Sequence, residues 1–246
     1  VLVTLDLLLP RALNIRDSTK IKTIITCHIN DYLPSPQKQL FPYVKKTMFR
    51  KVDPQPGVHQ FMDLISQHSD EPVDIKAKWD SLAALIYTGG TTGVSKGAML
   101  THANISSVIQ QFTAWFPELK GTVENLLGIY PVFHSAGFSV SQNLPIWNGW
   151  CCTLVPRPEP DVILEMLRKF KPTFLPGVPT IYTGLLNNEK FRKMDLSFVT
   201  GYFAGAAPLP EETLNQLKKL HGAVIHDVYG ATENTAFATV TPWKGT

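Results

Sequence analysis

The sequence predicts an α/β fold in which largely parallel sheets are flanked by helices. Two observations support this prediction. Short runs of β-branched and apolar residues alternate along the chain with segments of helical periodicity, as in βα units. The chain also has 246 residues, of which 44% are hydrophobic and 17% charged, so it can bury a substantial core.

Seven runs are strand candidates: residues 21–27, 83–88, 125–133, 151–155, 172–178, 198–205 and 223–230. Four segments have helical patterns: residues 102–116, 159–170, 179–188 and 209–222. The last of them carries acids in its first turn, lysines in its last turn and Gly222 as its stop. Residues 29–60 contain five prolines and are expected to be the loop-rich part.

Composition limits the partners and the compartment. The net charge of +3 is spread without a basic block, so no nucleic-acid partner is expected. The apolar start carries Asp6, is too short to span a bilayer and follows no basic stretch, which argues against a transmembrane segment or a signal peptide. The three cysteines lack metal-ligand spacing and favour reduced thiols in a cytoplasmic protein.

The run "YTGGTTGVSKGAML", residues 87–100, is the strongest functional signal. Its glycines allow the backbone to approach a ligand, and its hydroxyls and Lys96 suit anionic oxygens, so it predicts a phosphate-binding loop. We expect this loop at the carboxyl end of the strand over 83–88. A plain hairpin turn at Gly-Gly is the alternative. A P-loop phosphotransferase is disfavoured, because Lys96 stands between Ser95 and Gly97 instead of between glycine and Ser or Thr.

The longer stretch "YTGGTTGVSKGAMLTHAN" closely resembles the phosphate-binding signature of the adenylate-forming superfamily, which includes acyl-CoA synthetases, firefly luciferase and the adenylation domains of peptide synthetases. Three further stretches resemble the same family in the same order: "YPVFHSAGF" (130–138), "AGAAPLP" (204–210) and "VYGATENT" (228–235). "FLPGVPTIYTGLLNN" resembles its fatty-acyl branch. The resemblance covers essentially the whole chain, yet only the middle of a normally longer protein.

The resemblance implies ATP-dependent activation of a fatty acid to acyl-AMP, with release of pyrophosphate, followed by thioester formation with CoA. The implied catalytic residues are Lys96, His134, Thr232 and Glu233, and the implied Mg²⁺ ligands are Thr88 and Glu233. The residues implied to contact the nucleotide are Thr88, Gly89, Gly90, Thr91, Thr92, Gly93, Lys96, Gly205, Ala206, Ala207, Asp227, Tyr229, Gly230, Ala231 and Thr232.

The chemistry of these residues fits the implied roles. The Lys96 ammonium suits the leaving pyrophosphate, and carboxylate and hydroxyl oxygens suit Mg²⁺. By family analogy Tyr229 stacks on adenine and the Thr232 hydroxyl meets the α-phosphate. His134 would lie near the reacting carboxylate, although a lone histidine after a strand is also a common structural residue. Small residues at 205–207 would let the backbone pass flat against a purine.

Substrate choice depends on apolar candidates for an acyl pocket: Phe133, Phe138, Val140, Gly177, Val178, Thr180 and Ile181. An α-amino acid is disfavoured, because "FHSAGFSV" has no Asp to hold an amino group. Ser95 and Val228 depart from the family pattern, which commonly has proline and glycine there. Two alternatives stay open: adenylation of an aryl or other carboxylic acid, and a non-catalytic module that binds ATP or an acyl ligand.

The resemblance also implies a domain assignment. Residues 1–246 would be a partial N-terminal, ATP- and acyl-binding domain, and the small C-terminal domain with its catalytic lysine would be absent. We therefore expect the chain alone to be inactive or weakly active. The expected partners are small molecules, with a homodimer as one possible assembly.

Overall fold

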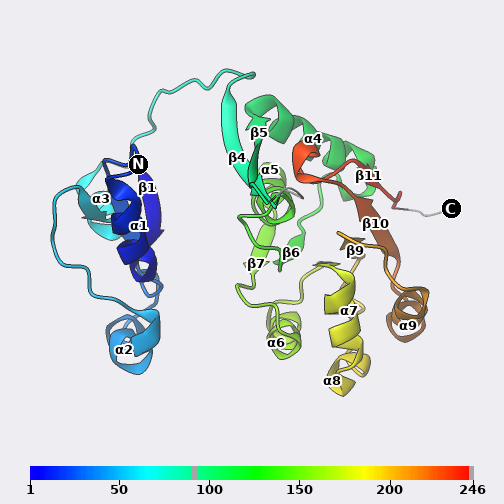
Figure 1. Cartoon of the computed structure of the whole chain (residues 1–246). Helices are drawn as coiled ribbons and strands as arrows, with labels where there is room; N and C mark the ends of the chain where they lie inside the picture. The colour runs from blue at the N-terminus through cyan, green and yellow to red at the C-terminus, as the bar shows by residue number, and fades with distance from the viewer. Residues whose placement is uncertain (90–92, 244–246) are drawn as a thin grey trace. The chain divides into compact units, whose positions relative to one another are not determined.

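The computed structural model describes residues 1–89 and 93–243 and has the predicted mixed α/β architecture (Figure 1). It divides into two compact units, residues 1–75 and 76–246. No helix among the described residues has both the length and the apolarity to cross a bilayer. The assignment of residues 1–246 to a single partial domain stays a prediction.

The first unit contains a three-stranded parallel sheet in the order β1 (Leu2–Leu5), β2 (Ile24–Cys27) and β3 (Val58–Gln60). Its helices are α1 (Leu9–Arg16), α2 (Gln37–Val44) and α3 (Phe61–Gln67), and its short 3₁₀ turns are η1 (Asp6–Leu8) and η2 (Lys46–Met48). The expectation of a loop over 29–60 was wrong for α2, η2 and β3. Helix α2 contains Pro42 and buries no residue, so neither its composition nor its pattern indicated a helix.

The second unit is built on a six-stranded sheet in the order β11-β10-β9-β8-β6-β7, which is parallel except at β11. The strands are β6 (Asn125–Gly128), β7 (Cys151–Leu154), β8 (Phe174–Gly177), β9 (Gly201–Gly205), β10 (Ile225–Tyr229) and β11 (Thr239–Val240). Five of the seven strand candidates therefore lie in this sheet. The run 125–133 yields a strand only as far as Gly128.

Helices cover both faces of this sheet (Figure 1). One face packs against α4 (His102–Trp115), the 3₁₀ turn η3 (Pro117–Leu119), the π-helix η4 (Gly137–Asn143) and α5 (Leu144–Asn148). The other face packs against α6 (Pro160–Phe170), α7 (Pro179–Leu186), α8 (Glu189–Arg192) and α9 (Glu211–His221). Because side chains alternate along a strand, Phe174 belongs to the first core and Leu175 to the second.

A separate hairpin carries the glycine-rich run. Strands β4 (Leu82–Thr88) and β5 (Lys96–Thr101) pair with each other in antiparallel orientation and form their own two-stranded sheet. The prediction that 83–88 joins the parallel sheet was therefore wrong, and β5 was not predicted. Lys96 and Gly97 are poor strand formers, so pairing with β4 decides the conformation there.

The hairpin leads directly into α4. Thr101 caps this helix: its hydroxyl accepts from the Asn104 N–H at 3.2 Å, and the Asn104 side chain accepts from the Thr101 N–H at 2.9 Å. This reciprocal pair satisfies two N–H groups that the first turn would otherwise leave free. It fixes where α4 starts, and hence which of its side chains face the sheet.

Candidate active site

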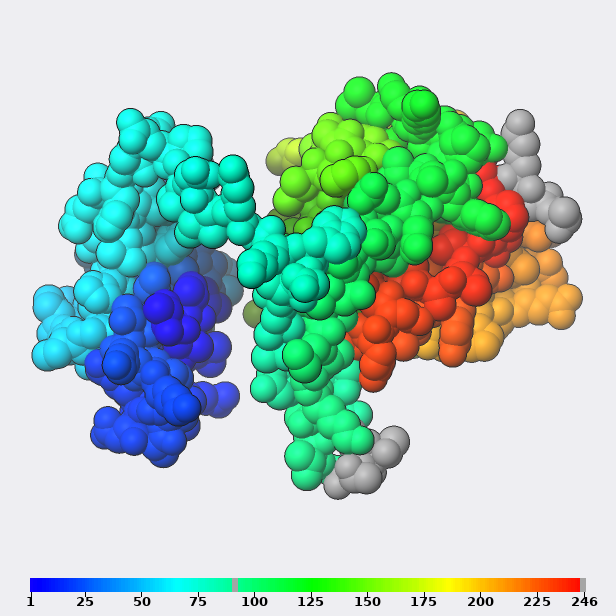
Figure 2. Space-filling view, turned by 90° about the horizontal axis from the view of Figure 1, so that it is seen from above, coloured from blue at the N-terminus to red at the C-terminus, as the bar shows by residue number. Residues whose placement is uncertain are grey.

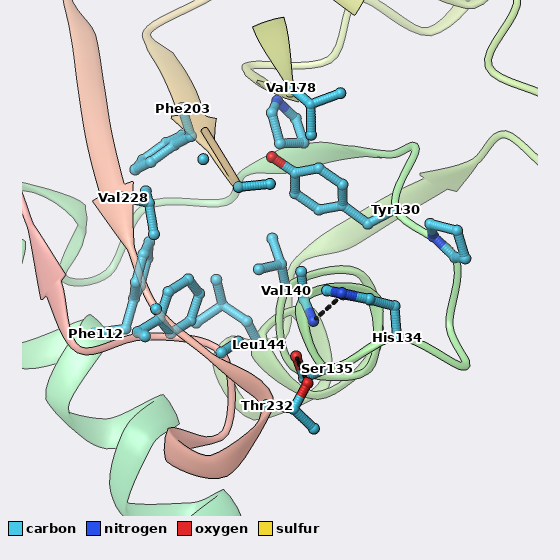
Figure 3. A pocket seen from close by; sticks show the side chains of 18 of the residues that line it. Phe112, Tyr130, His134, Ser135, Val140, Leu144, Val178, Phe203, Val228 and Thr232 are labelled. Atoms are coloured by element: carbon cyan, nitrogen blue, oxygen red, sulfur yellow. Dashed lines mark hydrogen bonds between the residues drawn. The ribbon is translucent and has the colours of Figure 1, made fainter. Parts of the chain in front are cut away.

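An apolar cavity of about 440 Å³ lies between the six-stranded sheet and the elements α4, η4 and α5 that cover one of its faces (Figure 3). Its exposed rim includes Phe133, His134 and Gly230, near the carboxyl ends of the strands. Its inner part is buried: Phe174 is 1% exposed and Leu144 is also 1% exposed. The cavity is therefore a slot that enters at the strand ends and continues into the core.

The period of two along β8 determines which side chains line this slot. Phe174, Pro176 and Val178 line it. Gly177 faces the opposite way, where an added Cβ would lie 2.7 Å from the Tyr182 ring. Of the apolar candidates, Phe133, Val140 and Val178 line the slot, whereas Phe138, Gly177, Thr180 and Ile181 do not. Thr180 and Ile181 belong to α7, which packs on the other face.

The stretch after β6 forms one wall. The His134 Nδ1 accepts from the Ala136 N–H at 3.1 Å, so a neutral ring carries its proton on Nε2. Gly137 is needed here, because a Cβ would lie 2.0 Å from the Pro131 carbonyl oxygen. The Tyr130 hydroxyl donates to the Gly177 carbonyl at 2.8 Å, and burial raises the Tyr130 pKa well above its usual range. The Tyr130 hydroxyl therefore remains a donor at neutral pH.

The turn after β10 forms the facing wall. It contains the 3₁₀ turn η5 (Thr232–Asn234), which the Asn234 side chain holds by accepting from the Ala231 N–H at 2.7 Å. The Thr232 hydroxyl oxygen lies 3.5 Å from the Ser135 hydroxyl oxygen. Ser139 also donates to the Thr235 carbonyl at 2.7 Å. The stretches 130–138 and 228–235, which are far apart in the sequence, thus meet beside the slot.

The hairpin reaches the same turn. Residues of β5 lie within 8 Å of residues of η5, measured between Cα atoms. Thr88 pairs with Lys96 in the hairpin register, and the Thr88 hydroxyl donates to the Lys96 carbonyl at 3.4 Å. Gly89, Gly93 and Lys96 are exposed. The predicted contacts at Gly90, Thr91 and Thr92 lie outside the described residues.

The predicted nucleotide residues outside the hairpin separate into two groups. Five of them line the slot: Gly205, Ala206, Gly230, Ala231 and Thr232. Ala207, Asp227 and Tyr229 do not. Asp227 and Tyr229 alternate with Val228, which lines the slot, so they face the other side of β10. Tyr229 is 71% exposed. Gly205, in contrast, is closely packed, because an added Cβ there would lie 3.2 Å from the Val228 carbonyl oxygen.

The predicted magnesium ligands fit a nucleotide-bound ion better than a site formed by protein alone. No group of three or more His, Cys, Asp or Glu side chains in the described part of the chain is arranged to hold a metal. Mg²⁺ bound with a nucleotide commonly needs only one or two carboxylates, because phosphates and water supply the other ligands. The exposed Glu233, on the turn beside β5, is compatible with that donor set.

Several lining residues were absent from the sequence-based site, and three of them bear on its geometry. Ser135 is 2% exposed and contacts Thr232; its place directly after His134 could have indicated it. Tyr130 opens the same stretch. Phe112 lies on α4, where it follows Val108 by four residues on the buried side, and Phe116, directly after the helix, continues this spacing.

The comparisons with known proteins agree with this geometry. The family model described as AMP-binding enzyme matches residues 2–246. The long-chain-fatty-acid–CoA ligase of Bacillus subtilis (strain 168) is 36% identical over 95% of this chain and 42% of its own length. The ligase of the same name from Escherichia coli O157:H7 is 31% identical over 92% of this chain and 41% of its own length. The chain thus spans less than half the length of these relatives.

Solved structures give the same result. ATP-bound MatB from Rhodopseudomonas palustris superposes with a TM-score of 0.70 at 26% identity, over 92% of this chain and 43% of its own. The anthranilate CoA ligase AuaEII in complex with anthranoyl-AMP superposes with a TM-score of 0.78 at 20% identity, over 99% of this chain and 43% of its own; this second likeness concerns the fold alone. With a family match over nearly its whole length, the chain belongs to the AMP-binding enzyme family.

Proposed function

We propose that the chain forms the nucleotide- and acyl-binding part of an acyl-CoA ligase that activates a fatty acid with ATP. The observation that supports this most directly is the contact between Ser135 and Thr232, 3.5 Å apart, beside a deep apolar slot. A phosphate-binding turn and a hydrophobic pocket would then adjoin, as an acyl adenylate requires. The names of the relatives favour a fatty acid as the substrate.

The reaction has two steps. A carboxylate oxygen attacks the α-phosphorus of ATP, the bond from that phosphorus to the bridging oxygen breaks, and pyrophosphate leaves. The thiol of CoA then attacks the acyl carbon, and AMP leaves. The first step depends mainly on positioning and on neutralisation of charge, which the protein can supply without a covalent intermediate.

The roles of the residues follow from their positions. The Thr232 hydroxyl would donate to the α-phosphate, and Lys96 would neutralise the leaving pyrophosphate. The His134 Nε2–H, at the rim of the slot, would donate to the charge developing at the carboxylate–phosphate junction. Glu233 and Thr88, together with phosphate oxygens, would hold Mg²⁺, which lowers the repulsion at the triphosphate.

A second candidate is adenylation of an aryl carboxylic acid. Phe112, Phe174, Phe203 and Phe237 all line the slot, and aromatic walls also suit an aryl ring. Pyrophosphate exchange with matched aliphatic and aryl acids separates the two candidates. A third, the non-catalytic module, predicts nucleotide binding with no exchange for any acid, including in a protein of the relatives' length.

The proposal is tested by titration calorimetry of the chain with AMP and with Mg-ATP. Thr232→Val removes a donor to an anionic group and should weaken AMP binding by about ten- to hundredfold. Thr239→Val, on β11 outside the slot, makes the same chemical change on an exposed strand and should leave the affinity unchanged. Equal losses in both variants, or no AMP binding by the parent chain, would refute the proposal.

A further inference from the structure

The depth of the slot can be worked out from the strand that runs along it. Phe174, Pro176 and Val178 all line the slot, and they lie on one face of β8 and the residue after it. Four residue steps along a strand cover roughly 13 Å. Phe174 is buried, at 1% exposure, whereas Val178 lies at the carboxyl edge of the sheet near the rim. The slot thus follows the strands inward for a distance of that order.

The inner end of the slot is closed by aromatic rings. Three phenylalanines line it and also contact aromatic rings behind it: Phe112, Phe174 and Phe203. The rings behind them, Phe116, His226 and Trp243, do not line the slot. Phe116 is 0% exposed, so solvent does not reach this ring behind the slot.

Phe112 differs from the other two phenylalanines in the element that carries it. Phe174 and Phe203 belong to β8 and β9, which are paired on both sides. Phe112 extends from α4 and lies across the slot from Tyr130 and His134 (Figure 3). Its ring is 4.8 Å from Phe116 and 5.1 Å from Phe237, between centroids, so neighbouring rings hold it in place. Shortening Phe112 would deepen the slot without altering a strand.

We propose that Phe112 sets the upper limit on the length of the acyl chain that this slot accepts. This inference rests on the proposed function, because it assumes that an aliphatic chain enters with its carboxyl group at the rim. Each methylene that the slot buries should improve affinity about fourfold. Once the chain reaches Phe112, further methylenes should bring no gain or a loss, since overpacking a core is unfavourable.

The test uses a series of acyl sulfamoyl adenosines, stable mimics of an acyl adenylate, with hexanoyl, octanoyl, decanoyl, dodecanoyl, tetradecanoyl and hexadecanoyl groups. Their dissociation constants for the parent chain are measured by calorimetry. Affinity should rise by more than about tenfold for each added pair of methylenes and then stop rising at one length. That length is the quantity that the variants should move.

Two variants should move the limit in opposite directions. Phe112→Leu should shift it to a longer acyl group, and Phe112→Trp should shift it to a shorter one. Phe116→Leu is the matched control. Phe116 directly follows the end of α4, belongs to the same aromatic cluster and is also buried, but it does not line the slot. It should lower stability without moving the limit and without changing AMP affinity.

The possible results distinguish a failure of the length limit at Phe112 from a failure of the proposed function. A limit that moves with Phe112 but not with Phe116 supports the inference. A limit that stays fixed in both Phe112 variants, or moves equally in Phe116→Leu, overturns it while leaving the proposed function intact. Should the parent chain bind AMP but gain nothing from any acyl group, both the acyl slot and its length limit are overturned.

Discussion

His226 combines burial, aromatic stacking and an unsatisfied nitrogen in a way that predicts acid sensitivity. It is 1% exposed and stacks between Phe203, at 5.1 Å, and Trp243, at 4.8 Å between ring centroids. Its Nδ1 lies 3.3 Å from the Thr241 carbonyl oxygen, and its Nε2 has no hydrogen-bond partner among residues 1–89 and 93–243. Burial lowers the His226 pKa from its usual value of 6.5, against smaller opposing contributions from Thr241, Pro242 and Asp227.

The lowered pKa determines the sign of the pH effect. Above pH 6.5 both the folded and the unfolded chain keep this ring neutral, and the free energy of unfolding is unaffected by its titration. As the pH falls below that value, the unfolded chain takes up a proton that the folded chain resists, so stability declines until the folded pKa is reached. Protonated Nε2 would be a charged donor without an acceptor, which costs at least about 1–3 kcal/mol.

The variant His226→Phe keeps an aromatic ring at this position and removes the group that titrates. Between pH 8 and pH 5 the parent chain should lose stability through this group, and the variant should lose less, by up to about 2 kcal/mol, because the unfolded ring takes up one proton below pH 6.5. Urea unfolding followed by near-ultraviolet circular dichroism measures both. His221→Phe should reduce the pH dependence in the same direction. Burial also lowers the His221 pKa, and its Nε2 is likewise buried and unpaired among the described residues. An unchanged pH dependence in His226→Phe would show that His226 takes up its proton equally in the folded and the unfolded chain.

Three further predictions concern the walls of the slot and the opposite face. In Gly230→Ala the new Cβ would lie 1.5 Å from the Ala236 carbonyl oxygen, so the turn bearing Thr232 must open, and AMP affinity in calorimetry should fall by more than about tenfold. Gly184→Ala, in α7, meets nothing closer than Pro160 Cγ at 3.4 Å and should stabilise the chain to urea by about 0.5–1 kcal/mol; a loss of stability would contradict this. Tyr130→Phe removes the 2.8 Å bond to the Gly177 carbonyl and should cost about 1–3 kcal/mol in the same urea assay, whereas a neutral result would show that the bond contributes nothing.

The elements predicted correctly are those in which capping residues, stop residues and the spacing of apolar residues agree with the packing of the folded chain. A helix over 102–116 was predicted from its pattern, and the structure has it over His102–Trp115, with Thr101 as its cap. The helix ending at His221 stops at Gly222, which adopts a φ of +63°, as the stop signal requires. Strand β5 failed this rule, because its conformation comes from pairing with β4 and from no feature of its own residues.

The acyl-pocket residues were only partly predictable, because the sequence interpretation followed contiguity in the chain instead of strand periodicity. Gly177, Val178, Thr180 and Ile181 are consecutive or nearly so, and they divide between the two faces of the sheet. A period of two would have selected Phe174, Pro176 and Val178. Phe112 needed more than periodicity, since only the packing of α4 on the sheet brings it to the same slot.

The meeting of Ser135 and Thr232 required the tertiary fold as well. Strands β6 and β10 are separated in the sheet by β8 and β9, so their carboxyl ends lie roughly 14 Å apart. The stretch after β6 must therefore cross the ends of two strands before it reaches the turn after β10. The Tyr130 hydroxyl, bonded to the carbonyl of Gly177 at the end of β8, fixes the first part of that crossing. Ser135, bonded across to Thr232, completes it. The order of the motifs in the chain says nothing about this bridge, yet the bridge forms part of the wall of the slot and places the turn that bears Thr232 at its mouth.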